Sequence, residues 1–295
     1  MRTTVVRRVA FGLVIAALIW LIGVWPPPVW WRTHWPAQTA MMRLHRDTGG
    51  YQPTPLDGMA PLLQRMVIIG EDSRFRTHHG LDLVEIRDAL GLEPGAGVGR
   101  TIKTLWKRRD RLRGASTITQ QLAKNLYLSP SRNPLRKLKE AVTALRIELA
   151  LPKDRILEVY LSVVELGPGV WGMSAASARY FGTTPANLTE AQAAALAATL
   201  PFPRSSNPGY RSARMLHRRD LILARYHGMD VYIPPEEELL DSIPLPAFTP
   251  PLVPPALDSL IAESLLVAPL DSGGDTLRDS VTDAGADSVA DSVPN

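Results

Sequence analysis

The sequence predicts an all-α (α-dominated) protein whose helical body follows one N-terminal transmembrane helix. Behind a basic N-terminus, the stretch from Val9 to Trp25 contains no charged residue. From about 59 to 227, apolar residues recur three and four positions apart, and alternating β-branched runs are few. Hydrophobic residues fill 45% of the 295 positions, so the chain can bury a sizeable core.

The first helix is expected to anchor the chain in a membrane. The 17 uncharged residues of 9–25 would rise about 26 Å at about 1.5 Å each, just enough to cross a bilayer. A cleaved signal peptide is the alternative, but the stretch runs into Trp25-Pro26-Pro27-Pro28 without a small-x-small cleavage site. The basic residues before it place the N-terminus in the cytoplasm, so the chain after Trp35 lies on the other side.

Residues 1–35 are therefore predicted to form a cytoplasmic tip, the anchor and an interfacial segment. Four tryptophans cluster where an aromatic belt at the bilayer surface would lie. Ordinary core packing is the alternative for them. They are Trp25, Trp30, Trp31 and Trp35.

Two helices of the body are the most clearly marked. Within 134–150, five apolar residues make one stripe, and the charged residues of the segment's first half lie off it. The stripe consists of Leu135, Leu138, Val142, Leu145 and Leu149. The second helix, about 189–200, is rich in alanine and suits close helix packing. Residues 91–99 are predicted to form a loop before a basic segment, 100–113, which has seven basic residues and one acid.

Charge and cysteine content narrow the chemistry. The chain has no cysteine, which excludes disulfides, thiolate nucleophiles and Cys-ligated zinc. Residues 241–295 carry nine acids and one basic residue, so the first 240 residues have a net charge of +12 within a total of +4. A basic body predicts a polyanionic partner, namely nucleic acid, anionic lipid or a phosphate-bearing substrate. A location outside the cytoplasm argues against nucleic acid.

The C-terminal part has a different character. Eight prolines fall between Pro234 and Pro255, and Asp-Ser pairs follow in a sequence poor in aromatic residues. We therefore predict a folded body over 36–233 and a Pro-rich linker with a disordered acidic tail over 234–295. A docking role for this tail is the alternative to a solvated spacer.

Glu71 is the first candidate for chemistry. It directly follows the apolar run 62–69. A carboxylate at the C-terminal end of an apolar helix faces the negative end of the helix dipole and is partly desolvated, which raises its pKa. Such a group can act as a general base. The alternative is a surface acid paired with Arg74 or Arg76.

The second candidate is the polar segment 114–125. Thr117 and Gln120 have the spacing of a capping box, which predicts the start of a helix. The N–H groups at such a start can also bind an anion. Capping does not account for three further polar residues on one helical face. They are Gln121, Lys124 and Asn125.

The third candidate is a cationic band around one carboxylate. Arg136 and Glu140 are four positions apart, so a solvated salt bridge is the simplest interpretation. With Lys124 and Arg132, however, this helix would offer the arrangement that a pyrophosphate leaving group needs.

Five segments in a fixed order carry a family resemblance. They are Glu71-Asp72-x-x-Phe75-x-x-His78-x-Gly80; 114–125; Arg136-Lys137-x-x-Glu140; Ile156-Leu157-Glu158-x-Tyr160-Leu161 through Gly167 and Gly172 to Tyr180-Phe181-Gly182; and Leu188-Thr189-x-x-Gln192-Ala193 to Asn207-Pro208. By these motifs, over roughly 60–208, the chain resembles the peptidoglycan glycosyltransferases of the lysozyme-like type, particularly their monofunctional, membrane-anchored members.

The resemblance implies roles for individual residues. Glu71 matches the family's catalytic base and Glu140 its second acid, whereas Lys124 and Arg132 match residues that hold substrate phosphates. Further substrate-binding residues of the same cleft would be Ser116, Gln121, Lys137 and Lys139. The resemblance names no certain cofactor and leaves open a divalent cation, Mg²⁺ or Mn²⁺, near Glu140.

The chain departs from the family pattern at three places. Ala115 replaces a usual glycine, Ser162 replaces a usual asparagine, and the stretch between Asp82 and Gly114 is longer and more basic than expected. Only 87 residues follow Pro208, without a Ser-x-x-Lys and Lys-Thr-Gly pair, so a monofunctional enzyme is expected.

The implied activity is polymerisation of lipid II, the lipid-linked disaccharide-pentapeptide, into glycan strands by inverting transfer with release of polyprenyl pyrophosphate. The implied partners are lipid II, the lipid-linked glycan strand and the membrane, together with cell-wall synthesis or division proteins, and no nucleic acid. The expected location is the bacterial inner membrane, single-pass, with the catalytic domain on the periplasmic side. Two alternatives are a lytic peptidoglycan glycosidase, which needs no phosphate-binding band, and a catalytically decayed wall-binding scaffold.

Overall fold

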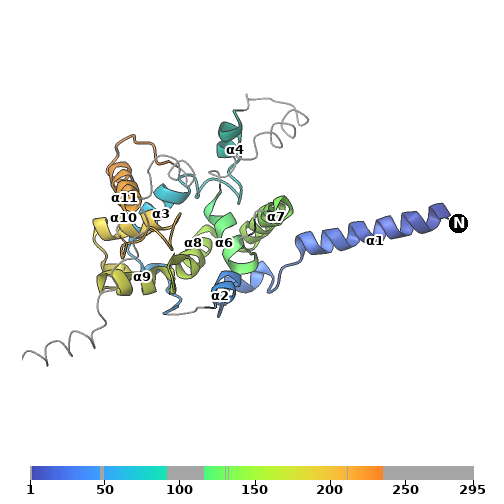
Figure 1. The fold of residues 1–295 in the computed structure, drawn as a ribbon, viewed down its shortest axis with the longest axis horizontal. Helices are drawn as coiled ribbons and strands as arrows, with labels where there is room; N and C mark the ends of the chain where they lie inside the picture. The colour runs from blue at the N-terminus through green and yellow to red at the C-terminus, as the bar shows by residue number, and fades with distance from the viewer. Residues whose placement is uncertain are drawn as a thin grey trace, which may run out of the picture. The chain divides into compact units, whose positions relative to one another are not determined.

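A computed structural model describes residues 2–46, 50–91, 116–129, 131, 133–210 and 212–234. All of them belong to one compact unit, Met1–Ala247. Helices dominate this part of the chain, as predicted (Figure 1). The basic segment 100–113, Arg132, the acidic tail and all but the first residue of the loop 91–99 lie outside the described residues.

The described elements follow one another with short connections. They are α1 (Arg2–Ile22), η1 (Pro28–Arg32), α2 (Ala40–His45), η2 (Leu56–Gly58), α3 (Pro61–Glu71), α4 (Leu83–Leu90), α6 (Ile118–Tyr127), α7 (Pro134–Ala150), α8 (Lys153–Val163), β1 (Glu165–Gly167), β2 (Val170–Trp171), α9 (Gly172–Phe181), η4 (Pro185–Asn187), α10 (Glu190–Thr199) and α11 (Ala213–Tyr226).

The apolar helix α1 stands apart from the core. Its window Val5–Ile22 is long and apolar enough to cross a membrane, and none of that window is buried against the rest of the protein. Figure 1 shows α1 projecting away from the other helices. These properties are compatible with a single-pass membrane anchor.

The four tryptophans after α1 divide between the two expected roles. Trp31 belongs to the core, and its indole N–H donates to the Tyr127 hydroxyl at 2.5 Å. Trp35 is partly buried against the core. Trp25 and Trp30 are 85% and 48% exposed, so only these two could form an interfacial belt.

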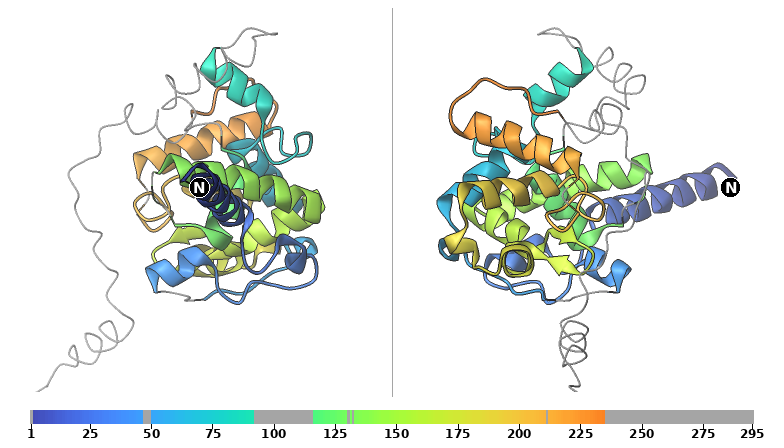
Figure 2. Two further views of the ribbon diagram at one scale, coloured as in Figure 1. Left: turned by 90° about the vertical axis from the view of Figure 1, so that its right-hand side faces the viewer. Right: turned by 60° about the vertical axis from the view of Figure 1, so that its left-hand side comes forward.

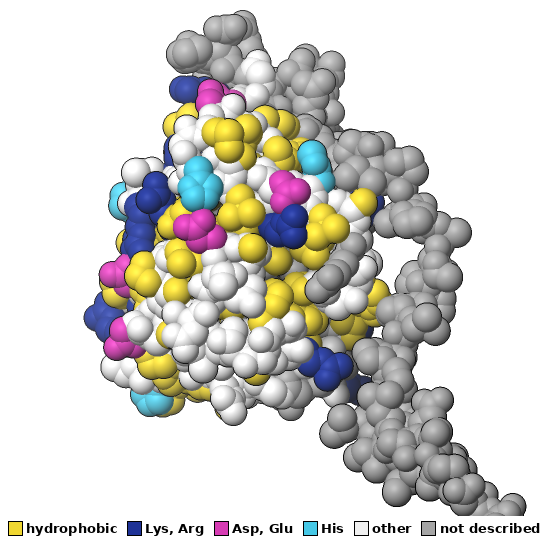
Figure 3. All heavy atoms as spheres, turned by 90° about the vertical axis from the view of Figure 1, so that its left-hand side faces the viewer, with side chains coloured by type: hydrophobic (Ala, Val, Ile, Leu, Met, Phe, Trp, Pro, Cys, Tyr) yellow, Lys and Arg dark blue, Asp and Glu magenta, His cyan; other side chains and the backbone are white. Residues whose placement is uncertain are grey.

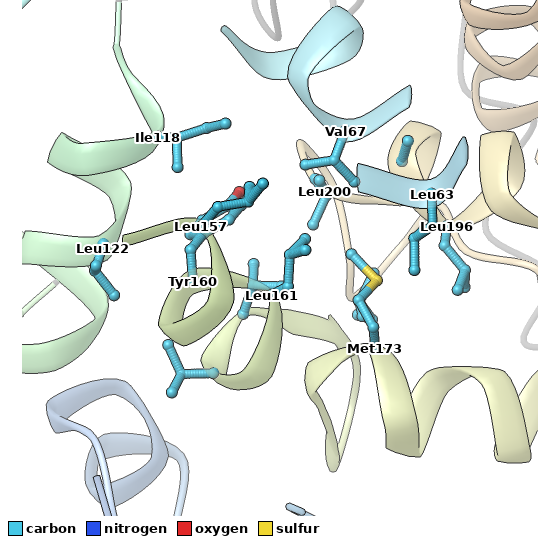
Figure 4. Close-up of a cluster of buried hydrophobic side chains, with 14 of the residues drawn as sticks. Leu63, Val67, Ile118, Leu122, Leu157, Tyr160, Leu161, Met173, Leu196 and Leu200 are labelled. Atoms are coloured by element: carbon cyan, nitrogen blue, oxygen red, sulfur yellow. The ribbon is translucent and has the colours of Figure 1, made fainter. Parts of the chain in front are cut away.

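The core surrounds α8, which begins directly after Pro152. Nearly every residue of α8 from Ile156 onward is buried. Figure 4 shows side chains from α3, α6, α9 and α10 meeting this helix. The side chains labelled there are Leu63, Val67, Ile118, Leu122, Leu157, Tyr160, Leu161, Met173, Leu196 and Leu200.

Both predicted body helices are confirmed, α7 to the residue. The Asn133 side chain accepts the Leu135 N–H and caps the N-terminus of α7, and Pro134 occupies the first turn. For α10, Thr189 and Gln192 form a capping box. The leucine stripe of α7, however, is not its buried face. The buried residues of α7 are Glu140, Thr143, Ala144 and Ile147.

A small antiparallel hairpin, β1 and β2, was not predicted, because strands this short show no alternation that could reveal them. Two glycines beside it are needed for close approach. A Cβ at Gly172, whose φ is +81°, would lie 2.2 Å from the Ser162 carbonyl oxygen. A Cβ at Gly167 would lie 2.1 Å from the Tyr180 hydroxyl, which donates to the Leu166 carbonyl.

Candidate active site

Asp72 fastens the end of α3 to the start of α6. Its Oδ2 accepts the Ile118 N–H at 2.9 Å, and its carboxylate also binds His78 Nε2 at 2.9 Å. Because the Gly80 N–H donates to His78 Nδ1, the imidazole proton lies on Nε2 and points at Asp72. The anion at this helix N-terminus is thus supplied by the chain itself, and the predicted free N–H groups are not all free.

A capping box continues this junction. As predicted, Thr117 accepts the Gln120 N–H, and the Gln120 side chain accepts the Thr117 N–H. The Thr117 hydroxyl also donates to the Gly80 carbonyl at 2.7 Å. Since Gln121 follows Ile118 by one turn of α6, the junction brings it opposite Glu71, the last residue of α3.

Glu71 is held from two sides. Gln121 Nε2 donates to its Oε2 at 2.8 Å, and Arg218 Nη2 lies 3.2 Å from its Oε1. The Tyr160 hydroxyl donates to Gln121 Oε1 at 2.8 Å, which fixes the amide with its NH₂ group toward Glu71. The Glu71 side chain is only 8% exposed.

The pKa of Glu71 is raised above its ordinary value, as predicted, and burial is the main cause. The positive charge of Arg218, the hydrogen bond from Gln121 and the charge of Lys124 each act in the opposite direction on this pKa. A carboxylate in this balance can accept a proton yet remain ionised in part.

Pairing of Glu71 with Arg74 or Arg76 is wrong as an alternative. Arg74 pairs instead with Asp82 and Glu85. Arg76 pairs with Asp154.

Arg218 was not identified from the sequence. Its side chain is 4% exposed, and it also donates to the Gly70 carbonyl from Nη2 and to the Pro234 carbonyl from Nη1. The available signal was its place on α11 between Met215 and Ile222, which are both buried. A cation inside the apolar stripe of a helix needs a buried partner.

Glu140 forms a second cluster. Its carboxylate is 3% exposed and accepts from both Arg136 Nη1 and Lys137 Nζ. Lys137 Nζ also lies 2.8 Å from the Ser116 hydroxyl, just before α6. The predicted salt bridge of Arg136 with Glu140 therefore exists, but its acidic end is buried and not solvated.

The surroundings of Glu140 do not suit a divalent cation. Mg²⁺ binds several oxygen ligands in near-ideal octahedral geometry. Both oxygens of Glu140 are already bonded to cationic side chains. Among the described residues, the group whose ligand atoms lie close enough for a metal is Asp72, His78 and Asp82. In that group, however, Asp72 is engaged by Ile118 and His78, and Asp82 by Arg74 and two backbone N–H groups.

The remaining predicted residues are placed differently from one another. Lys124 is half-buried on α6, and in the described part of the chain its ammonium has no hydrogen-bond acceptor. Lys139 lies away from Glu140, with Nζ 4.7 Å from the centroid of the Trp20 ring on α1. The structure thus groups Glu71 with Gln121 and Lys124, and Glu140 with Lys137 and Ser116.

This arrangement has a definite chemical capacity. A buried carboxylate with a raised pKa can take a proton from a hydroxyl group. A nearby unpaired ammonium can offset negative charge that develops on a leaving group. Together they suit displacement of an anionic group by a sugar hydroxyl.

The comparisons with known proteins point the same way. A family model described as Transglycosylase matches residues 39–227. A protein named biosynthetic peptidoglycan transglycosylase from Azoarcus sp. is 39% identical over 75% of this chain and 93% of its own length. One of the same name from Thiobacillus denitrificans is 38% identical over 74% and 91%. Another, from Bdellovibrio bacteriovorus, is 43% identical over 62% and 66%.

Proposed function

This chain belongs to the transglycosylase family, and we propose that it polymerises lipid II into peptidoglycan glycan strands by inverting transfer, with release of polyprenyl pyrophosphate. It is a peptidoglycan glycosyltransferase. The observation that carries the mechanism is Glu71, a buried carboxylate with a raised pKa that Gln121 and Arg218 hold in place.

In this mechanism Glu71 is the general base. It takes the proton of the acceptor sugar 4-hydroxyl, whose oxygen attacks the anomeric carbon of the donor strand from the face opposite the leaving group. The bond between that carbon and the pyrophosphate oxygen breaks, and its electron pair leaves with the lipid pyrophosphate. Gln121 and Arg218 hold the carboxylate still, so that no reorganisation is needed at the moment of transfer.

The cations of α6 and α7 have a separate role. Lys124, with Arg132, offsets the charge that develops on the departing pyrophosphate. Glu140 keeps Lys137 turned toward Ser116 and neutralises it in part. Lys139 is left out of this group because its ammonium lies over Trp20. No step is assigned to a metal ion.

The enzyme is placed in the bacterial inner membrane by α1. The basic N-terminus lies in the cytoplasm, and the glycosyltransferase domain, 36–233, lies on the periplasmic side. The exposed surface of α1 and the exposed Trp25 and Trp30 support this placement. Enzyme and lipid-linked substrate are then confined to one surface, which raises their effective concentration.

The test is direct. Purified full-length protein in detergent is incubated with lipid-linked disaccharide precursor, and the products are separated on a gel. We expect a series of glycan strands. A lytic glycosidase would instead shorten mature glycan with water, and a decayed scaffold would do neither, so each of these outcomes would contradict the proposal.

A further inference from the structure

The outer face of α7 carries large apolar side chains in water-accessible positions. Four leucines share this face, because they are spaced three, four or seven positions apart. Their exposed fractions are 59% for Leu135, 51% for Leu138, 41% for Leu145 and 86% for Leu149. A contiguous apolar row on an ordered helix marks an interaction surface, whereas single exposed leucines are ordinary.

This leucine face lies on the side of the body from which α1 leaves. The left view of Figure 2 looks along α1 toward the body, and α7 runs across that side. Two contacts join the helices. Lys139 Nζ lies over the Trp20 ring, and Arg146 donates to the Ile22 carbonyl at the end of α1.

The apolar surface continues into η1. Val29 and Trp30 are 54% and 48% exposed. Arg32 joins η1 to α7, since its Nε and Nη2 donate to the Ala150 carbonyl at 3.1 and 2.7 Å. A hollow of about 340 Å³ lies between the two elements, and Leu149 and Val29 line it.

We propose that the leucine face of α7, together with Val29 and Trp30, lies in the outer interface of the same bilayer that α1 spans. The inference rests on the membrane placement of α1 in the proposed function, but not on the chemistry of transfer. A helix of this kind lies in the membrane plane with its apolar face about 5–10 Å deep.

Two observations favour a lipid surface as the occupant. The face is continuous with α1, whose end it contacts, so a bilayer that accommodates α1 reaches α7 as well. Lys139, Arg146 and Arg32 flank the apolar residues, and basic side chains beside an apolar face suit anionic headgroups. The opposite side of the body, in Figure 3, instead shows Lys, Arg, Asp and Glu scattered among apolar side chains.

The placement has a consequence for the site. Glu140 lies on the buried side of α7, opposite the leucine face. Since a helix with its side chains is about 10–12 Å across, the Glu140 cluster would sit about that distance above the inserted leucines. Lys137 would thus be held at the depth of the lipid phosphates, where the pyrophosphate of a lipid-linked substrate enters.

The test uses the absence of cysteine in the chain. Full-length variants Leu149→Cys and Leu138→Cys are labelled with a thiol-reactive fluorophore. They are reconstituted in vesicles of phosphatidylethanolamine and phosphatidylglycerol that contain shallow or deep nitroxide lipids. Leu13→Cys in α1 is the buried-in-lipid control. Met229→Cys is the matched exposed control, because it follows α11, which Figure 1 shows on the side away from α1.

We expect shallow nitroxide lipids to quench the Leu149 and Leu138 probes at least about threefold more than the Met229 probe, given the interfacial depth of such helices. Equal quenching at Leu149 and Met229, with full access to aqueous iodide, would overturn the inference. Protection from iodide without lipid quenching would overturn it too, because a protein would then cover the face. Failure of the Leu13 probe to respond to deep nitroxide would show instead that the proposed anchor is wrong, and polymerisation measured on the same vesicles reports the chemistry separately.

Discussion

Arg218 and Glu71 are paired across 147 positions of the chain, with Nη2 and Oε1 3.2 Å apart. The proposed base therefore receives its nearest positive charge from α11, an element outside the five motifs that carry the family resemblance. Arg218 also donates to the Pro234 carbonyl, so the segment after α11 is tied to the same group.

Replacing Arg218 should change the pH dependence of polymerisation. Its positive charge lowers the pKa of Glu71, so Arg218→Met should raise that pKa further and move the acid limb of the pH–rate profile to higher pH. The other groups that face Glu71, namely Lys124, Gln121, Tyr160 and Asp72, are unchanged. We expect a loss of about tenfold or more at acidic pH that shrinks as the pH rises.

Arg218→Lys is the matched control for this experiment. It keeps the charge but loses the forked geometry, so its acid limb should shift less than that of Arg218→Met. Circular dichroism checks folding, because removing a buried partner of an ion pair can cost about 3–5 kcal/mol. A uniform loss at every pH would mean that Arg218 is only structural.

Glu71→Gln should abolish polymerisation, with a loss on the order of 10²-fold or more if general base catalysis is its role. Asp220→Asn, an exposed acid on α11, serves as the control and should leave the gel pattern unchanged. Activity of Glu71→Gln within a few-fold of the unmodified enzyme would rule out Glu71 as the base.

The same substitution makes a stability prediction with a fixed sign. Because the folded protein raises the pKa of Glu71 above 4.5, ionising this group opposes folding. Its favourable contribution is complete below about pH 4.5 and is lost as the pH rises through the raised pKa. The melting temperature of the unmodified protein, compared with that of Glu71→Gln, should therefore fall over this window, and a difference that stays constant with pH would contradict the raised pKa.

Tyr160→Phe should weaken both stability and activity. It leaves the buried Gln121 Oε1 without its donor, a cost of about 1–3 kcal/mol, and lets the amide turn its oxygen toward Glu71. Tyr180→Phe removes a comparable hydroxyl, which donates to the Leu166 carbonyl away from Glu71. Denaturant unfolding should show losses in both variants, whereas polymerisation should fall in Tyr160→Phe alone.

Lys124→Ala and Arg132→Ala should each reduce polymerisation by at least about tenfold, since a charge-assisted contact is typically worth roughly 1.5–3 kcal/mol. Thermal stability should change little in Lys124→Ala, because the ammonium has no acceptor among the described residues. Arg179→Ala, an exposed cation on α9, is the control. Normal polymerisation by both variants would remove the argument against a lytic enzyme.

Truncation should separate the acidic tail from the body. Deleting residues from Ser259 onward should leave polymerisation in detergent and the melting temperature unchanged. A shorter chain that ends at Met229 lacks Pro234, which accepts from Arg218, and should melt at a lower temperature. Loss of folding in the longer truncation would show that the tail contributes structure.

Local signals in the sequence were enough for the helices and for the candidate base. Capping boxes at Thr117 and Thr189 and the cap and proline before α7 act within one helical turn, so the residues that cause each helix start are neighbours in sequence. Glu71 was likewise recognisable, because an acid after an apolar run is desolvated wherever that run packs.

Tertiary structure decided which partners these residues meet. Amphipathic spacing gave α7 a leucine stripe, but packing buried the side with Glu140 and left the leucines outside. Packing also put Trp31 in the core and left Trp25 exposed. Arg218 reaches Glu71 only because α11 packs against α3, where Gly70 leaves room for Ile222. Helix periodicity repeats every few residues and fixes which side chains share a face, whereas the neighbour of that face depends on the whole packed core.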